Sequence, residues 1–311
     1  MYVVSSRRRW LTNGGSWTVL QTGNALPPAT APQSNYLPAG FINSLQDPLV
    51  ILIHGYANRE PDAFGQYAKA IGTSVSGGSM AANGFQGTVI GYDWPSFDTP
   101  ISGPLHQYAG DLKAARDVGA PSLASFLSRL IAVVGGRGIR INLMAHSMGN
   151  FVLRQMLIAN PALARCLDNI ISFAPDLLQA DLQQPDLRAA ADVLTGNWFV
   201  YWAQADFVLL GLSNWANIIL GNEQWGGQRL GQEGPPSGVT SQRVVAQEWD
   251  APLAQDLGST YNWDLREWPF NAEIHSLYWS NRPFLTNVAQ NLQRAPATPP
   301  VTVNWPLPPR P

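Results

Sequence analysis

Short apolar runs alternate along the chain with longer segments in which apolar residues recur every three or four positions. The short runs are rich in Val, Ile, Leu and aromatic residues, which predicts strands over 2–5, 16–20, 49–53, 88–91, 139–144, 170–173, 198–202 and 244–248. Helical spacing predicts helices over 61–76, 105–134, 150–158 and 282–293, the second of them broken near Gly119 and Pro121. Because the main strands lack a polar face, we predict an α/β fold, with a mostly parallel, twisted sheet covered by helices on both faces.

The pattern divides the chain into three parts. Residues 1–44 hold the first two strands and a connector marked by Pro and Gly, residues 45–294 form the main domain, and residues 295–311 form a Pro-rich tail that we expect to be extended. Within the main domain, residues 207–240 make a long insertion that begins apolar and becomes Gly-rich around Trp225. We interpret this insertion either as a cap or pocket wall or as an ordinary core helix, and the pattern favours neither.

One strand-to-helix junction carries a motif for nucleophilic catalysis. The fifth predicted strand runs into the segment Ala145-His146-Ser147-Met148-Gly149, and a predicted helix follows at once. Small residues two positions before and after a serine fit the sharp turn of a nucleophile elbow, which exposes the hydroxyl above the sheet. Ser147 is therefore the predicted nucleophile, at a helix start that also stabilises negative charge.

The position of His275 predicts that it is the general base. Enzymes with this elbow carry their triad in the order serine, acid, histidine. Of the four histidines, His54, His106 and His146 precede Ser147, so that only His275 satisfies this order. It lies in a polar segment between the last strand and the last helix, which we interpret as a loop.

The acid of the triad is predicted from strand ends. Asp206 follows the strand over 198–202, the commoner location for this acid, and is the preferred candidate. Asp176 follows the preceding strand and Asp250 follows the last one, so both stay open as alternatives. The carboxylate would orient the imidazole and stabilise the imidazolium as it forms.

Two backbone groups are predicted to form an oxyanion hole. One is the N–H of Met148, directly after the nucleophile. The other is the N–H of Tyr56, in the loop that follows the strand over 49–53, where Gly55 allows the backbone to pass close beneath the substrate.

Further residues are predicted to line the substrate pocket. Asp93 and Trp94 follow another strand end, and Gly55 and His146 adjoin the oxyanion loop and the nucleophile. His54 is interpreted as a brace for the oxyanion loop and not as a chemical group of the reaction.

With these residues in place, the chain resembles the α/β-hydrolase superfamily. A functionally uncharacterised bacterial branch of it has stretches similar to Gly91-Tyr92-Asp93-Trp94-Pro95-Ser96 and Ala174-Pro175-Asp176. The resemblance covers roughly residues 45–293 and implies the α/β-hydrolase fold and hydrolysis of esters, thioesters or amides, without a metal or an organic cofactor. Ala145 stands where the commonest motif has Gly; several lipase families share this form, but lipase activity does not follow from it.

Composition and charge narrow the range of partners. A net charge of −2, with 13% charged residues, gives no field that would attract nucleic acid or an anionic membrane. Cys166 is the only cysteine, which excludes an intrachain disulfide, and we expect it to be buried in a helix. We see no apolar signal core and no stretch near the roughly 18 apolar residues of a membrane helix. We therefore expect a cytoplasmic protein without a membrane span.

These features predict a serine hydrolase that cleaves the carboxylic ester of a small-molecule substrate through an acyl-enzyme. Its activity should fall on acidification through roughly pH 6–7, as His275 takes up a proton. One alternative is an acyltransferase that passes the acyl group from the same triad to an alcohol or amine. The other is a non-catalytic binding protein on a hydrolase scaffold, against which the complete triad argues.

Overall fold

The structure, a computed structural model, describes most of the predicted sheet and the helices around it. The described residues are 2–7, 16–21, 35–56, 58, 63, 65–67, 80–96, 104–206, 208–209, 227–238, 241–250, 253, 274–294, 300 and 302. Most of the predicted helix over 61–76, of the insertion over 207–240 and of the tail over 295–311 lies outside these residues.

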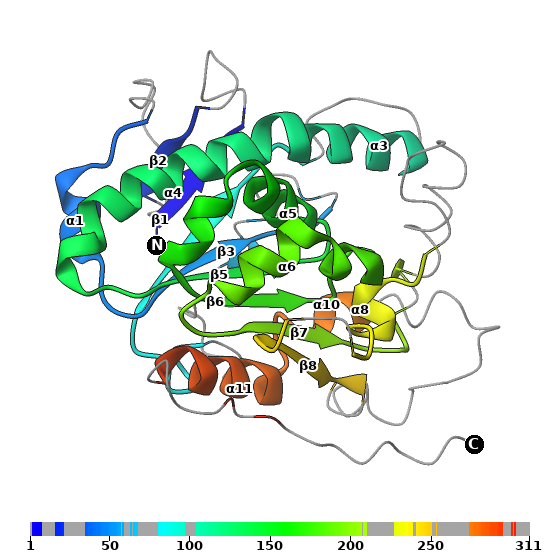
Figure 1. The fold of residues 1–311 in the computed structure, drawn as a ribbon. Helices are drawn as coiled ribbons and strands as arrows, with labels where there is room; N and C mark the ends of the chain where they lie inside the picture. Colours follow the sequence, from blue (N-terminus) through cyan, green and yellow to red (C-terminus); the bar gives the residue numbers. More distant parts are fainter. Residues whose placement is uncertain are drawn as a thin grey trace.

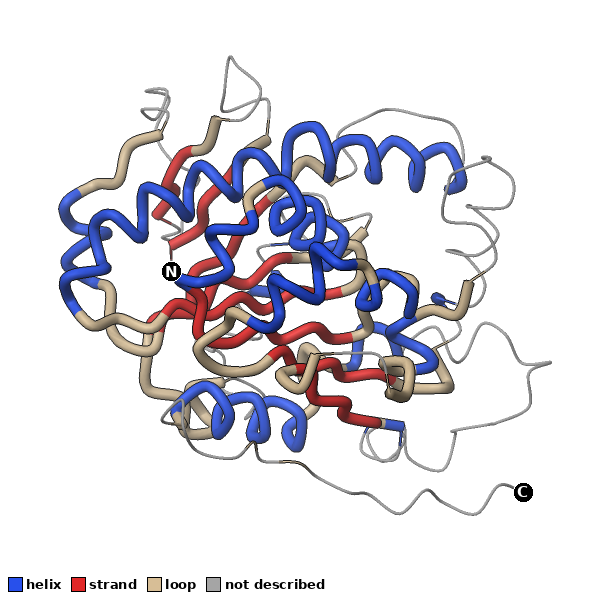
Figure 2. The backbone as a smooth tube through the Cα atoms, in the orientation of Figure 1, coloured by secondary structure: helices blue, strands red, loops and turns tan. Residues whose placement is uncertain are grey.

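The described strands form one eight-stranded sheet (Figures 1 and 2). In spatial order they are β2 (Thr18–Gln21), β1 (Tyr2–Ser5), β4 (Thr88–Asp93), β3 (Leu49–Ile53), β5 (Ile141–His146), β6 (Leu167–Phe173), β7 (Trp198–Trp202) and β8 (Val244–Glu248). Every neighbouring pair is parallel except β1 and β2. The loops that follow β3, β4, β5 and β7 therefore meet at one edge of the sheet, where ligands of such folds bind.

Helices cover both faces of this sheet. The described ones are α1 (Ala39–Ser44), α3 (Pro104–Ala114), α4 (Ala120–Val134), α5 (Gly149–Ala159), α6 (Pro185–Asp192), α8 (Leu230–Glu233), α10 (Ile274–Leu277) and α11 (Arg282–Gln293). Alternate side chains of β3 enter two separate cores: Ile51 packs with α4 and α5, and Leu52 packs with α11. The predicted α/β architecture with two covered faces is confirmed (Figure 1).

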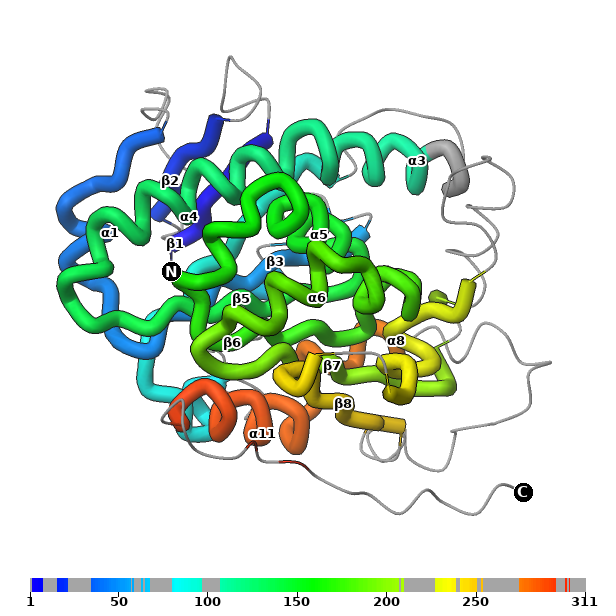
Figure 3. Tube along the Cα trace, viewed as in Figure 1, coloured from blue at the N-terminus to red at the C-terminus, as the bar shows by residue number. Residues whose placement is uncertain are grey.

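The strand β4 is longer than the sequence predicted. It continues through Tyr92 and Asp93, which pair with Val4 and Ser5 of β1. The two strands from the N-terminal part thus join the edge of the main sheet, as the blue strands in Figure 3 show. Pairing with β1, which is distant in sequence, extends β4 beyond its own apolar run. The residues around β4 do not show this pairing, so the sequence pattern could not predict it.

The predicted break near Gly119 and Pro121 does not occur. A π-helical turn, Ala115–Gly119, joins α3 directly to α4. Proline has no N–H for a regular helix and its ring crowds the preceding turn, whereas a widened turn can absorb both effects without ending the helix. The result is one continuous helical stretch across one face of the sheet.

One stretch is more apolar than we expected, and one side chain is more exposed. The helical stretch Gln107–Arg137 is long and apolar enough to cross a membrane, although 56% of its most apolar window is buried inside the protein. Core helices pass the same test, so this one stretch is weak evidence for a membrane span. Cys166 is exposed, at the end of the 3₁₀ segment Pro161–Cys166.

Candidate active site

The predicted nucleophile lies in a strained turn between β5 and α5. Ser147 has a φ of 49°, in the left-handed region that side chains other than glycine rarely adopt. Its N–H donates to Phe173 O at 3.2 Å, and its own carbonyl accepts the N–H of Asn150 at 3.0 Å. A Cβ at Gly149 would lie 2.5 Å from His54 O, so a larger residue could not stand there. The motif therefore forms a nucleophile elbow held on both sides.

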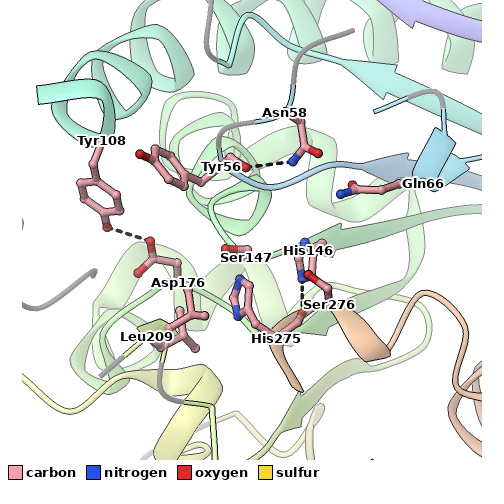
Figure 4. Close-up of a pocket in the computed structure, with 11 residues that line it drawn as sticks. Tyr56, Asn58, Gln66, Tyr108, His146, Ser147, Asp176, Leu209, His275 and Ser276 are labelled. Carbon is pink, nitrogen blue, oxygen red and sulfur yellow. Dashed lines mark hydrogen bonds between the residues drawn. The ribbon is translucent and has the colours of Figure 1, made fainter. Parts of the chain in front are cut away.

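The structure brings His275 and Asp206 together. His275 Nδ1 lies 2.8 Å from Oδ2 of Asp206, which is fully buried beyond the end of β7. His275 belongs to the short helix α10, whereas the sequence predicted a loop. The bond to Asp206 puts the ring proton on Nδ1 and leaves Nε2 as the base. Figure 4 shows the ring directed toward Ser147.

The two alternative acids have other partners. Asp176 lines the same pocket and accepts bonds from Tyr108 O–H at 2.7 Å and Arg229 Nη1 at 3.2 Å. Asp250 accepts two backbone N–H groups, at 2.8 and 2.9 Å, in the turn that precedes Asp206. The carboxylate bonded to His275 is that of Asp206, and Asp250 supports the turn that carries it.

Opposing effects act on the proton affinity of His275. Burial is the largest single effect and lowers its pKa, but the charge of Asp206, the hydrogen bond to Asp206 and the charge of Asp176 all raise it. Their sum holds the pKa of His275 above its ordinary value of 6.5. The unprotonated form of His275, which can act as a base, therefore predominates only at a pH above this raised pKa.

His146 supports the backbone of the predicted base. Its Nε2 lies 2.7 Å from His275 O, so Nε2 donates and Nδ1 carries no proton. Burial, followed by the nearby charge of His275, holds the pKa of His146 well below its ordinary value. Its ring packs between Phe173 and Trp279, at centroid distances of 4.9 and 5.2 Å. A neutral His146 thus borders the pocket and fixes the chain at α10.

The predicted oxyanion donors border the nucleophile. Met148 directly precedes α5, and its N–H has no acceptor among the residues that the structure describes. Gly55 approaches so closely that a Cβ there would lie 2.8 Å from Ser147 Cβ. Tyr56, the next residue, lines the pocket.

Asp93 and Trp94 do not line the described pocket. Asp93 is fully buried and accepts bonds from Arg7 Nε at 2.7 Å and Ser5 Oγ at 2.8 Å. Trp94 stacks on the His54 ring at 5.3 Å and donates its indole N–H to His54 O at 2.8 Å. Because β4 runs two residues further than predicted, these side chains enter the interior and not the pocket. His54 lies where the sequence interpretation put it, as a brace of the loop.

The pocket is small, and both polar and apolar groups line it. It encloses about 110 Å³ and is lined by Tyr56, Asn58, Gln66, Tyr108, His146, Ser147, Asp176, Val208, Leu209, His275 and Ser276 (Figure 4). Burial, and next the charge of Asp111, raises the pKa of Tyr56 to about 12, so its phenol stays neutral. Sequence reasoning missed Asn58, Gln66 and Tyr108, since no motif marks them. Val208 and Leu209 lie at the start of the insertion over 207–240, so this part of the insertion forms a wall of the pocket.

No group of three or more His, Cys, Asp or Glu side chains suited to a metal ion occurs among the described residues. The hydroxyl, imidazole and backbone N–H groups around Ser147 are of the types that acyl transfer uses.

The fold has a counterpart in a known family. Residues 33–233 match the family described as alpha/beta hydrolase of unknown function (DUF900). The chain belongs to this family. The match confirms the resemblance to the α/β-hydrolase superfamily and supports a hydrolase.

The other comparisons add little to the family match. Curated proteins give no match to this α/β-hydrolase. Among solved structures, it is similar to the crystal structure of Aspergillus fumigatus lipase B, with a TM-score of 0.46 and 11% identity. That similarity covers 83% of this chain and 55% of the lipase, so the chain spans about half the length of the lipase.

Proposed function

We propose that this α/β-hydrolase is a serine hydrolase that cleaves small carboxylic esters through an acyl-enzyme. The observation that carries the proposal is the 2.8 Å contact between His275 Nδ1 and the buried Asp206 Oδ2, because His275 lines the same pocket as Ser147. His275 Nε2 takes the hydroxyl proton as Ser147 attacks the ester carbonyl, and then gives that proton to the leaving alcohol. Water, activated by the same nitrogen, releases the acid and restores Ser147.

The oxyanion of each tetrahedral intermediate needs donors that are already in position. In this proposal the N–H groups of Met148 and Tyr56 are these donors, with the start of α5 adding favourable partial charge. Loss of one such donor typically costs about 10²–10³ in turnover.

The pocket supports a short acyl group. A cavity of about 110 Å³ leaves little room for a long chain. We therefore expect p-nitrophenyl acetate or butyrate to be cleaved faster than the palmitate ester.

The test uses a fluorophosphonate probe together with p-nitrophenyl esters from acetate to palmitate. Labelling and turnover should be present in the wild type and absent in Ser147→Ala. The mutant must keep the wild-type thermal unfolding temperature, so that loss of fold is not mistaken for loss of chemistry. Labelling of folded wild type that persists in Ser147→Ala would exclude Ser147 as the nucleophile.

The same experiment distinguishes the alternatives. Stoichiometric labelling without hydrolysis, followed by acyl transfer when an alcohol or amine is added, would make the protein an acyltransferase. Folded wild type that neither reacts with the probe nor cleaves any ester would contradict the enzymatic proposal and leave a binding protein on this scaffold.

A further inference from the structure

A buried arginine next to the first strand reaches the loops that follow β3 and β4. Arg7 is 1% exposed and donates from Nε to Asp93 Oδ1 at 2.7 Å. Its Nη1 donates to Ser96 O at 2.8 Å, and its Nη2 donates to Asn58 O at 2.7 Å. One guanidinium therefore ties the N-terminal part of the chain to both loops.

Two routes lead from Arg7 to the carbonyl of Gly55. Along the first, Asn58 Nδ2 donates to Gly55 O at 3.1 Å. It also donates to Tyr56 O at 2.9 Å, the bond drawn in Figure 4. Along the second, His54 Nδ1 lies 2.9 Å from Gly55 O, and His54 Nε2 lies 3.3 Å from Asp93 Oδ1 in a contact without hydrogen-bond geometry. Both routes end on the same peptide group.

That peptide group carries one of the proposed oxyanion donors. In a planar trans peptide, the C=O and the following N–H point in opposite directions. Since His54 and Asn58 hold the Gly55 carbonyl on one side, the Tyr56 N–H must point to the other side. Gly55 lies directly beside Ser147. A rotation of this peptide plane would therefore turn the Tyr56 N–H away from the oxyanion that forms on the substrate of Ser147.

We infer that Arg7 is a positioning residue of the oxyanion hole, which fixes the Gly55–Tyr56 peptide through the hydrogen bonds of Asn58, with the Asp93–His54 contact as a weaker second link. Arg7 precedes the stretch 33–233 that matches the family. The geometry requires a guanidinium, because a lysine ammonium lacks the planar set of donors that reaches three separated oxygens. The expected effect of Arg7 on catalysis rests on the proposed function. Its role in holding the loop that contains Gly55 and Tyr56 does not.

The test compares Arg7→Lys with Arg137→Lys. Arg137 is the matched control, because it also bridges two backbone carbonyls, those of Ile42 and Leu45, but these precede β3, at the far end of the sheet from the pocket. For Arg7→Lys we expect kcat for a p-nitrophenyl ester to fall about 10- to 100-fold, with KM within about threefold, because the interaction lost acts on the transition state. Arg137→Lys should keep the wild-type kcat.

Amide hydrogen exchange of peptides that cover residues 54–58 tests the positioning without any substrate. Exchange in this segment should be at least about tenfold faster in Arg7→Lys than in the wild type and unchanged in Arg137→Lys. Folded Arg7→Lys with wild-type kcat, or with wild-type exchange at 54–58, would overturn the inference. If the wild type proves inactive, the proposed function fails, and the exchange result alone then decides whether Arg7 holds the loop.

A second variant separates positioning from folding. Replacing Arg7 by a neutral residue leaves the Asp93 carboxylate buried without its guanidinium partner, which can unfold the protein. In Arg7→Met/Asp93→Asn this charge is removed as well. We expect it to fold and to show the same loss of kcat and fast exchange as Arg7→Lys; wild-type values for both would overturn the inference.

Discussion

Asp206 and Asp176 are both buried carboxylates near His275, but only Asp206 is bonded to Nδ1. In Asp206→Asn the amide can donate to Nδ1, which favours the tautomer with its proton on Nε2 and removes the base. We expect kcat to fall by about 10⁴ with little change in KM, measured by steady-state kinetics on a p-nitrophenyl ester. Asp176→Asn should lose no more than about tenfold; an equal loss in both variants would contradict the assignment of Asp206.

The pKa of His275 makes a prediction for the acid limb of the rate profile. The base must be unprotonated, and its pKa is raised, so kcat/KM should fall as the pH drops through a midpoint above 6.5. The measurement is kcat/KM as a function of pH in buffers of constant ionic strength. A rate that stays constant down to about pH 5 would exclude His275 as the base.

Asp176 contributes to that midpoint through its charge. Its carboxylate raises the pKa of His275, so Asp176→Asn should move the acid limb toward lower pH. Asp117→Asn is the matched control, since it removes one carboxylate charge from the exposed surface near the junction of α3 and α4. The same midpoint in Asp176→Asn and the wild type would show that the acid limb reports another group.

At the scale of elements, the oxyanion loop and the elbow are built against each other. A Cβ at Gly55 would lie 2.8 Å from Ser147 Cβ and 2.9 Å from His146 Nδ1, and neither atom ends a flexible side chain. Gly55→Ala should therefore displace the loop and lower kcat by at least about 10². Gly135→Ala, whose Cβ would meet nothing within 4 Å, should keep the wild-type rate. Wild-type kcat in Gly55→Ala would contradict this close approach.

Some elements were predictable because their signals are local. The elbow follows from the residues around Ser147, and His275 follows from chain order, without knowledge of the tertiary structure. Asp93 was assigned to the pocket because it follows an apolar run, yet pairing of β4 with β1 turns it into a partner of Arg7. Asn58 belongs to no motif, and its role appears only through its contacts. Sequence patterns report burial and turns, but not which loops of distant strands will touch.

At the scale of the whole molecule, the N-terminal strands are part of the same folded unit as the triad. β1 lies between β2 and β4, and Val3, Val4 and Trp17 are fully buried. Arg7 continues from β1 into the network beneath the oxyanion loop. We therefore propose that residues 1–44, although separated from the main domain by the sequence pattern, unfold together with it.

A matched pair of valines tests whether residues 1–44 unfold together with the main domain. Val4 on β1 is fully buried in the core beneath α4, whereas Val19 on β2 is only half-buried against the same core. Val4→Ala should lower the free energy of unfolding by about 2 kcal/mol through lost burial and a cavity, and Val19→Ala by less than about 1 kcal/mol. Urea unfolding followed by tryptophan fluorescence and by esterase activity should give one coincident transition, which shifts as a whole in Val4→Ala. If the fluorescence of Val4→Ala instead changed in an early, separate step while activity persisted, the ribbon of β1 and β2 would be an independent unit, and the site would not depend on it.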